Sequence, residues 1–135
     1  TTIINFVEGT RFTEQKKNHK HSPFHYLLPP KAGGIAFTLA SMGEQFNAIL
    51  DFTLLYPDNE RHAALDMLMG RLKRVVVQVE VLPVDQQVLG DYFNDEQFRQ
   101  RFQLWLNQRW QHKDQLIARY HQTDTVNNPA EQLPC

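Results

Sequence analysis

The spacing of apolar residues along the 135-residue chain predicts three strands. Residues 1–7 are rich in β-branched residues and carry apolar side chains toward both faces, which is typical of a buried strand. Residues 48–56 form the longest strongly apolar run and predict a second strand. Residues 74–84 alternate between a valine face and a partly polar face. This third pattern predicts a strand at an edge or in a half-covered position, ended by Pro83.

Helical spacing occupies the segments between and after these strands. Apolar residues recur every three or four positions over residues 31–43, which predicts an amphipathic helix. Residues 63–69 predict a short helix from their propensities. Asn94, followed three residues later by Gln97, has the pattern of a helix start, and the helix is expected to run to about Tyr120. Its apolar stripe consists of Phe98, Phe102, Trp105, Leu106, Trp110, Leu116 and Ile117.

Together these elements predict an α/β fold. A strand, a helix and a second strand form a right-handed crossover, so residues 1–7 and 48–56 are expected to be parallel neighbours. The expected architecture is a small, mostly parallel sheet packed by helices, with a long C-terminal helix lying across it. Residues 1–122 are expected to form this unit, and residues 123–135 are expected to be a disordered tail.

Charge is unevenly distributed along the chain, although the net charge is only −1. Over residues 11–31, five lysines and arginines against one glutamate give +4, so the remainder carries −5. The overall balance gives no case for nucleic-acid binding. The single cysteine, Cys135, allows no internal disulfide, which fits a reducing compartment. No apolar run approaches the ~20 residues that a membrane-spanning helix needs.

The most basic segment, residues 16–21, is predicted to be a mobile loop from its composition. His19, His21 and His25 lie close together in sequence, and such a group can bind a metal ion. However, no cysteine or carboxylate stands at metal-ligand spacing, so we expect solvated histidines and no metal. The lysines lack the aromatic interleaving of a nucleic-acid site. A lip over an anionic substrate or an acidic membrane surface suits them better.

Glu8, Gly9, Thr10 and Arg11 follow directly after the first predicted strand. Gly9 allows a sharp turn with no Cβ to block a close ligand, and backbone N–H groups at such a turn can bind an anion. The guanidinium of Arg11 matches phosphate, whereas an Arg–Glu pair on a solvated turn is the alternative. Lys31 lies at a predicted helix start, against the helix-dipole preference, so it either holds an anion or is an ordinary exposed lysine.

The same turn carries a family resemblance. Residues 6–11, Phe-Val-Glu-Gly-Thr-Arg, resemble the Phe-Pro-Glu-Gly-Thr-Arg-Ser block of the glycerolipid acyltransferases, with Val7 in place of proline and residues 12–13 where serine is common. Residues 27–34 resemble the Pro-Lys/Arg-x-x-Gly element of the lysocardiolipin-acyltransferase-like branch. Residues 51–59 resemble the strand of that branch that ends in Tyr-Pro-x-Asn. The three elements occur in the family's order, and the resemblance spans about residues 3–112.

The resemblance implies an acyltransferase of phospholipid biosynthesis or remodelling. The donor would be acyl-CoA or acyl carrier protein, and the acceptor a lysophospholipid of the 1-acylglycerol-3-phosphate (lysophosphatidate) type, with no cofactor. The implied acceptor site comprises Glu8, Gly9, Thr10 and Arg11, with Lys31 as a second phosphate ligand. Arg11 would clamp the phosphate, and Glu8 would orient the acceptor or brace the catalytic dyad.

The family's His-x4-Asp dyad does not occur in this chain. His62 and Asp66 have the wrong spacing and the wrong order relative to the turn. The chain is therefore expected to be a fragment, inactive and soluble by itself, of an enzyme at the cytoplasmic face of an intracellular membrane. It is also expected to dimerise through the sheet edge and the apolar face that the absence of earlier strands exposes. A non-catalytic module that binds phosphate or a lipid headgroup is the alternative.

Overall fold

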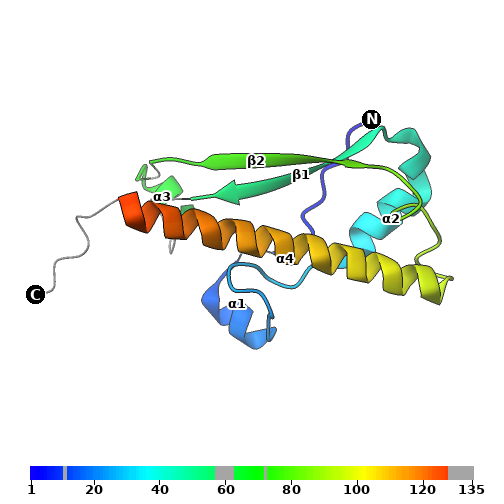
Figure 1. Ribbon diagram of the computed structural model, residues 1–135, viewed down its shortest axis with the longest axis horizontal. Coiled ribbons are helices and arrows are strands. Elements are labelled where there is room, and N and C mark those ends of the chain that lie inside the picture. The colour runs from blue at the N-terminus through cyan, green and yellow to red at the C-terminus, as the bar shows by residue number, and fades with distance from the viewer. Residues whose placement is uncertain (11, 57–62, 72, 128–135) are drawn as a thin grey trace, which may run out of the picture.

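The computed structural model describes residues 1–10, 12–56, 63–71 and 73–127. A hairpin of two strands lies along the long C-terminal helix α4, with α2 near one end of the hairpin and α1 on the opposite side of α4 (Figure 1). The elements, in chain order, are α1 (Glu14–His19), α2 (Ala32–Met42), the 3-10 turn η1 (Gly43–Gln45), β1 (Ala48–Leu55), α3 (Ala63–Leu68), β2 (Val76–Pro83) and α4 (Glu96–Asn127).

The sheet is antiparallel, and the prediction of a mostly parallel sheet is wrong for the described residues. β1 pairs with β2 over its whole length, and Asp51 lies opposite Glu80 in the register. Residues 1–6 form no strand and are exposed, so the predicted buried strand at residues 1–7 is also wrong. Residues 1–7 are apolar, but they do not pair with β1. The strand that pairs with β1 is β2, the segment with alternating side chains further along the chain.

The helices predicted over residues 31–43, 63–69 and from Asn94 onward are all present in the structure. α2 lies where the apolar spacing predicts a helix, and α3 lies where the residue propensities predict one. The start of α4 differs by one residue, because the Oδ1 atom of Asp95 accepts from the N–H groups of Gln97 and Phe98, at 3.0 and 3.1 Å. Asp95 therefore caps the helix instead of Asn94. The helix continues to Asn127, into the predicted tail, and residues 128–135 lie outside the described part.

The predicted loop at residues 16–21 is mostly helical. α1 begins after Thr13, whose Oγ1 accepts from the N–H of Lys16 at 3.2 Å. Glu14 places an acidic side chain in the first turn, where the helix dipole favours it. Composition alone suggests a loop here, but a threonine cap and an acidic first residue favour a helical turn.

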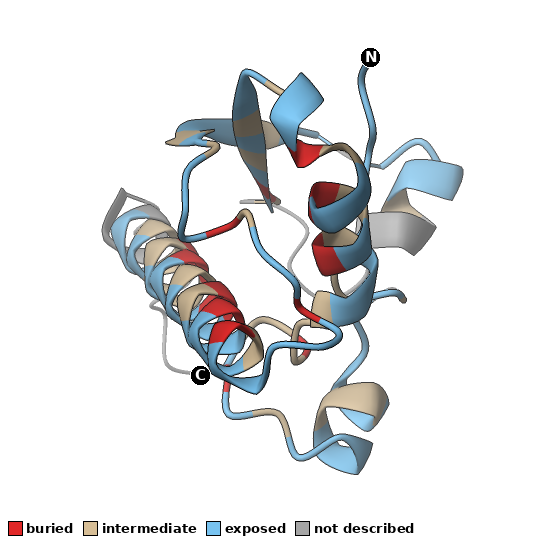
Figure 2. Cartoon of the chain, turned by 90° about the vertical axis from the view of Figure 1, so that its right-hand side faces the viewer, coloured by how far each residue is buried: buried red, intermediate tan, exposed pale blue. Residues whose placement is uncertain are grey.

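The core gathers on one side of α4. Its largest cluster joins α4 to α2 and to the connection after β2, through Ala36, Leu39, Val88, Tyr92, Phe98 and Phe102. A second cluster contains Phe24, Leu106 and Trp110. Figure 2 shows the buried residues of α4 along the side of the helix that faces the rest of the chain. The predicted apolar stripe of α4 is therefore confirmed, and it positions the N-terminal turn through Trp110.

Candidate functional site

The Glu-Gly-Thr segment forms a tight turn held by its own backbone. The N–H of Gly9 donates to the carbonyl of Phe6 at 2.9 Å, and Gly9 has a φ of +69°. Only glycine adopts this left-handed conformation without strain. The N–H of Lys31 donates to the carbonyl of Val7 at 2.8 Å, so the start of α2 is fastened to the turn. The two sequence elements that carry the family resemblance are therefore neighbours in space.

Two lysine side chains flank this turn. A Cβ built on Gly9 would lie 3.4 Å from both Nζ and Cδ of Lys31, so the Lys31 side chain covers the glycine. The second lysine, Lys16, donates from Nζ to Oγ1 of Thr10 at 2.7 Å. Two ammonium groups beside a tight turn are suited to holding an anion. We call Gly9, Thr10, Lys16 and Lys31 the lysine-flanked turn.

Lys16 is the member of this group that the sequence reasoning did not single out. The positive excess over residues 11–31 marked the region, but five cations contributed to it. Choosing among them requires knowing that α1 turns back toward Thr10. A contact between residues six positions apart in an irregular segment has no periodic signature in the sequence.

Glu8 points away from the lysine-flanked turn and into the protein. Its Oε1 accepts from the N–H of Leu28 at 3.3 Å. Burial raises the pKa of the Glu8 carboxyl, opposed by the Leu28 hydrogen bond, by Trp110 and by the charges of Lys113 and Lys20. Trp110 also donates its Nε1–H to the carbonyl of Leu28 at 3.0 Å. The half-buried carboxylate thus holds the turn against α4.

Replacing Glu8 by glutamine is expected to change how stability depends on pH. A carboxyl whose pKa is raised by folding contributes full stability below the unfolded-state pKa, and that contribution is lost as pH rises through the folded-state pKa. Glu8→Gln keeps an oxygen for Leu28 but cannot ionise. The free energy of unfolding of the variant, relative to wild type, should therefore increase between about pH 4 and pH 7.

Urea unfolding at both pH values measures this difference. Glu44→Gln, which removes an exposed carboxylate in η1, is the matched control and should change much less with pH. A difference between Glu8→Gln and wild type that stayed constant across this range would contradict the expectation.

Several predicted positions are not described by the structure. Arg11, the proposed phosphate clamp, lies outside the described residues. The same holds for His62 and for the Pro57–Asn59 part of the Tyr-Pro-x-Asn element. Among the histidines near α1, the backbone N–H of His25 donates to Asp114 at 2.9 Å. In the part of the chain that is described, no group of three or more metal-ligating side chains is placed to hold a metal ion.

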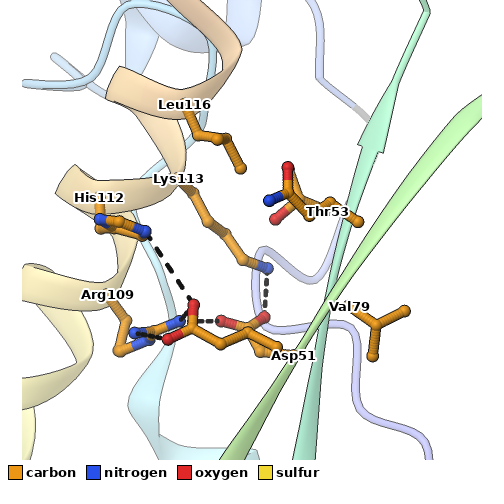
Figure 3. Close-up of a pocket in the computed structure, with 9 residues that line it drawn as sticks. Asp51, Thr53, Val79, Arg109, His112, Lys113 and Leu116 are labelled. Atoms are coloured by element: carbon orange, nitrogen blue, oxygen red, sulfur yellow. Dashed lines mark hydrogen bonds and ion pairs between the residues drawn. The ribbon is translucent and has the colours of Figure 1, made fainter.

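A second polar cluster lies between α4 and the hairpin, around a cavity of about 250 Å³ (Figure 3). Arg109 donates to both oxygens of Glu80 and, at 3.2 Å, to Oδ2 of Asp51. One helical turn later, Nζ of Lys113 lies 2.5 Å from Oδ1 of Asp51 and donates to the carbonyl of Phe52 at 2.8 Å. The hydrogen bond to Arg109 lowers the pKa of Glu80.

Each cation of this cluster is already bound to a carboxylate from the hairpin. Lys113 also lies 4.9 Å from the centre of the Trp110 ring. The cluster therefore joins α4 to both strands and does not leave its charges available for a ligand. This ion-pair cluster holds α4 against the two strands. The lysine-flanked turn is therefore the better candidate for a ligand-binding site.

Curated proteins similar to this chain are acyltransferases. It is 24% identical over 131 residues to lysocardiolipin acyltransferase 1 of Mus musculus, covering 89% of this chain and 33% of that protein. It is 31% identical over 127 residues to 1-acyl-sn-glycerol-3-phosphate acyltransferase delta of Homo sapiens, covering 87% of this chain and 31% of that protein. Over most of its length, this chain is similar to these two acyltransferases.

The resemblance predicted from the turn and from the two following elements is thereby confirmed. The chain spans about a third of the length of the curated relatives it matches. No family model matches the chain, and no solved structure gives a significant match. Among the helices that the structure describes, none combines the length and the apolar character needed to cross a bilayer.

Proposed function

We propose that this chain is the acceptor-binding part of an acyltransferase that moves a fatty acyl group from acyl-CoA or acyl carrier protein to a lysophospholipid. The acceptor would be of the 1-acylglycerol-3-phosphate type. The observation that carries this proposal is the lysine-flanked turn, where Nζ of Lys16 meets Thr10 and the Lys31 side chain covers Gly9. The phosphate of the acceptor would replace the Lys16–Thr10 contact and bind both ammonium groups.

The remaining roles follow from this placement. Arg11 follows the turn in sequence, and we assign its guanidinium to the same phosphate. Glu8 would act as a positioning residue, because its carboxylate is directed toward Leu28 and Trp110. Gly9 would let the phosphate approach the backbone, as only a residue without a Cβ permits.

The chemical step would need groups outside this chain. Acyl transfer to a hydroxyl requires a general base, and the His-x4-Asp dyad of the family does not occur here. We therefore expect the chain by itself to bind the acceptor without turning it over. The parent enzyme would work at the cytoplasmic face of an intracellular membrane, where its lipid substrates are.

Binding of sn-glycerol 3-phosphate, followed by NMR titration, tests the assignment of the turn. Charge-assisted hydrogen bonds contribute roughly 1.5–3 kcal/mol, so Lys31→Ala, Lys16→Ala and Arg11→Ala should each weaken binding about 10-fold or more. Lys17→Ala is the matched control. It removes the same charge from α1, but neighbouring residues on a helix point in different directions.

The outcomes separate the possible ligands. Tighter binding of glycerol 3-phosphate than of inorganic phosphate would support an acceptor site, whereas equal binding would indicate a general anion site. Unchanged affinity in Lys31→Ala and Lys16→Ala would refute the assignment.

A non-catalytic module that binds a lipid headgroup through the same lysine-flanked turn is the second candidate. The coding region before Thr1 distinguishes the two. A His-x4-Asp motif in that region would support the enzyme, and its absence would support the binding module.

A further inference from the structure

One face of the β1–β2 hairpin is apolar and exposed. The positions that alternate with Asp51 and Thr53 point away from α4, as Figure 3 shows for Val79. Across this face the register places Leu50 opposite Val81, and Phe52 opposite Val79. The exposed members are Leu50, Phe52, Leu54, Val75, Val77, Val79 and Val81, with exposed fractions between 41% and 67%. We call these seven residues the valine face.

The two faces of the hairpin are chemically different. The face toward α4 carries Asp51, Thr53 and Glu80, and it is held by Arg109 and Lys113. The valine face has no charged or polar side chain at any position of the described strands, from Ala48 opposite Pro83 to Leu54 opposite Val77. A partner for it must therefore be apolar as well.

We propose that the valine face binds the valine face of a second copy of this chain. Seven half-exposed side chains of this size offer roughly 500 Å² of apolar surface per copy. Two copies face to face would bury roughly 1,000 Å², which is the lower end of what a specific protein interface needs. A patch of this size on one molecule is near the upper end of what monomers leave exposed.

The geometry of the face suits a symmetric pairing. In a two-fold dimer the same patch meets itself, so a surface without charges is self-complementary and no like charges are brought together. Two sheets packed in this way lie about 10 Å apart with their side chains interdigitating, and Phe52 near the centre would fill the gaps between the valines of its partner. The result is a helix–sheet–sheet–helix particle with α4 outermost on both sides.

This assignment narrows the sequence-based expectation, which was pairing through a sheet edge and an apolar face, to the face alone. Edge pairing would leave both valine faces in water, whereas face-to-face pairing covers the larger apolar surface. The modest area leads us to expect micromolar affinity, since area of this size sits at the weak end of specific interfaces.

Sedimentation analysis of the chain over a range of concentrations tests the proposal. Wild type should show a monomer–dimer equilibrium, and Phe52→Asp and Val79→Asp should each weaken the dimer by at least about 100-fold, because each places two unpaired carboxylates in an apolar interface. Leu104→Asp is the matched control. Leu104 is 59% exposed on α4, away from the valine face, and the variant should dimerise like wild type.

Far-UV circular dichroism verifies that each variant is folded. Methyl NMR shifts of the wild type on dilution provide a readout that needs no variant, and they should move for the leucines and valines of the valine face. A wild-type monomer at all concentrations would overturn the proposal, even if it bound lipid vesicles. A dimer that survives both face variants, dilution shifts elsewhere, or assemblies larger than a dimer would overturn it equally.

Discussion

Truncation of Phe102 to alanine is expected to lower the free energy of unfolding by about 3–5 kcal/mol. Phe102 is fully buried. Its ring centre lies 5.3 Å from that of Trp105 and 5.6 Å from that of Tyr92. It therefore joins α4 to the connection after β2, and the cavity left by its ring is enclosed on several sides. Such a loss is a large part of the total stability of a small domain.

Guanidinium unfolding followed by circular dichroism measures this effect. Leu104→Ala, on the same helix but 59% exposed, is the control and should cost no more than about 0.5 kcal/mol. Equal losses for the two variants would mean that α4 does not use this side to pack against the rest of the chain.

Removal of the Asp51 carboxylate is expected to cost about 3 kcal/mol or more. Asp51 faces both Arg109 and Lys113, and the Lys113 side chain is only 10% exposed. In Asp51→Leu, Arg109 keeps Glu80, but Lys113 keeps only the carbonyl of Phe52 and the ring of Trp110, and no bound carboxylate. A cation would then remain in a largely buried site without its counter-charge.

A paired variant separates this explanation from a simple packing defect. If the cost comes from the unpaired cation, Asp51→Leu combined with Lys113→Met should recover most of the lost stability, because an apolar pair can replace a buried ion pair at little cost. Arg99→Ala, which breaks the exposed ion pair with Glu96, should cost less than about 1 kcal/mol. A double variant no more stable than Asp51→Leu alone would contradict the electrostatic account.

Local patterns made much of the fold predictable. α4 carries a long apolar stripe and an acidic start, and β2 has a continuous valine face, so β2 and the start of α4 could be located to within a few residues. The end of α4 could not, because the helix continues past the expected Tyr120 to Asn127. The segment at residues 1–7 has an equally apolar pattern, but whether it forms a strand depends on a partner. The structure ties its end to Lys31 by one backbone hydrogen bond and leaves Ile4 and Phe6 exposed.

The candidate site was predictable only in part. The turn could be predicted from Gly9 and its charged and hydroxyl neighbours, because glycine is the residue that adopts a left-handed conformation freely. The direction of the Glu8 side chain could not be predicted, since it depends on Leu28 and on Trp110, which lies about a hundred positions further along the chain. The clamp between Asp51 and Arg109 joins residues 58 positions apart, and no local pattern encodes such a contact.

The position of Trp110 gives the chain an internal optical probe. Its indole is bonded to the carbonyl of Leu28 and stands beside the Glu8 carboxyl, directly behind the turn. With Trp105 replaced by phenylalanine, all indole emission would originate from this one position. Changes at the turn would then shift the wavelength and intensity of the Trp110 fluorescence, without a label attached to the protein.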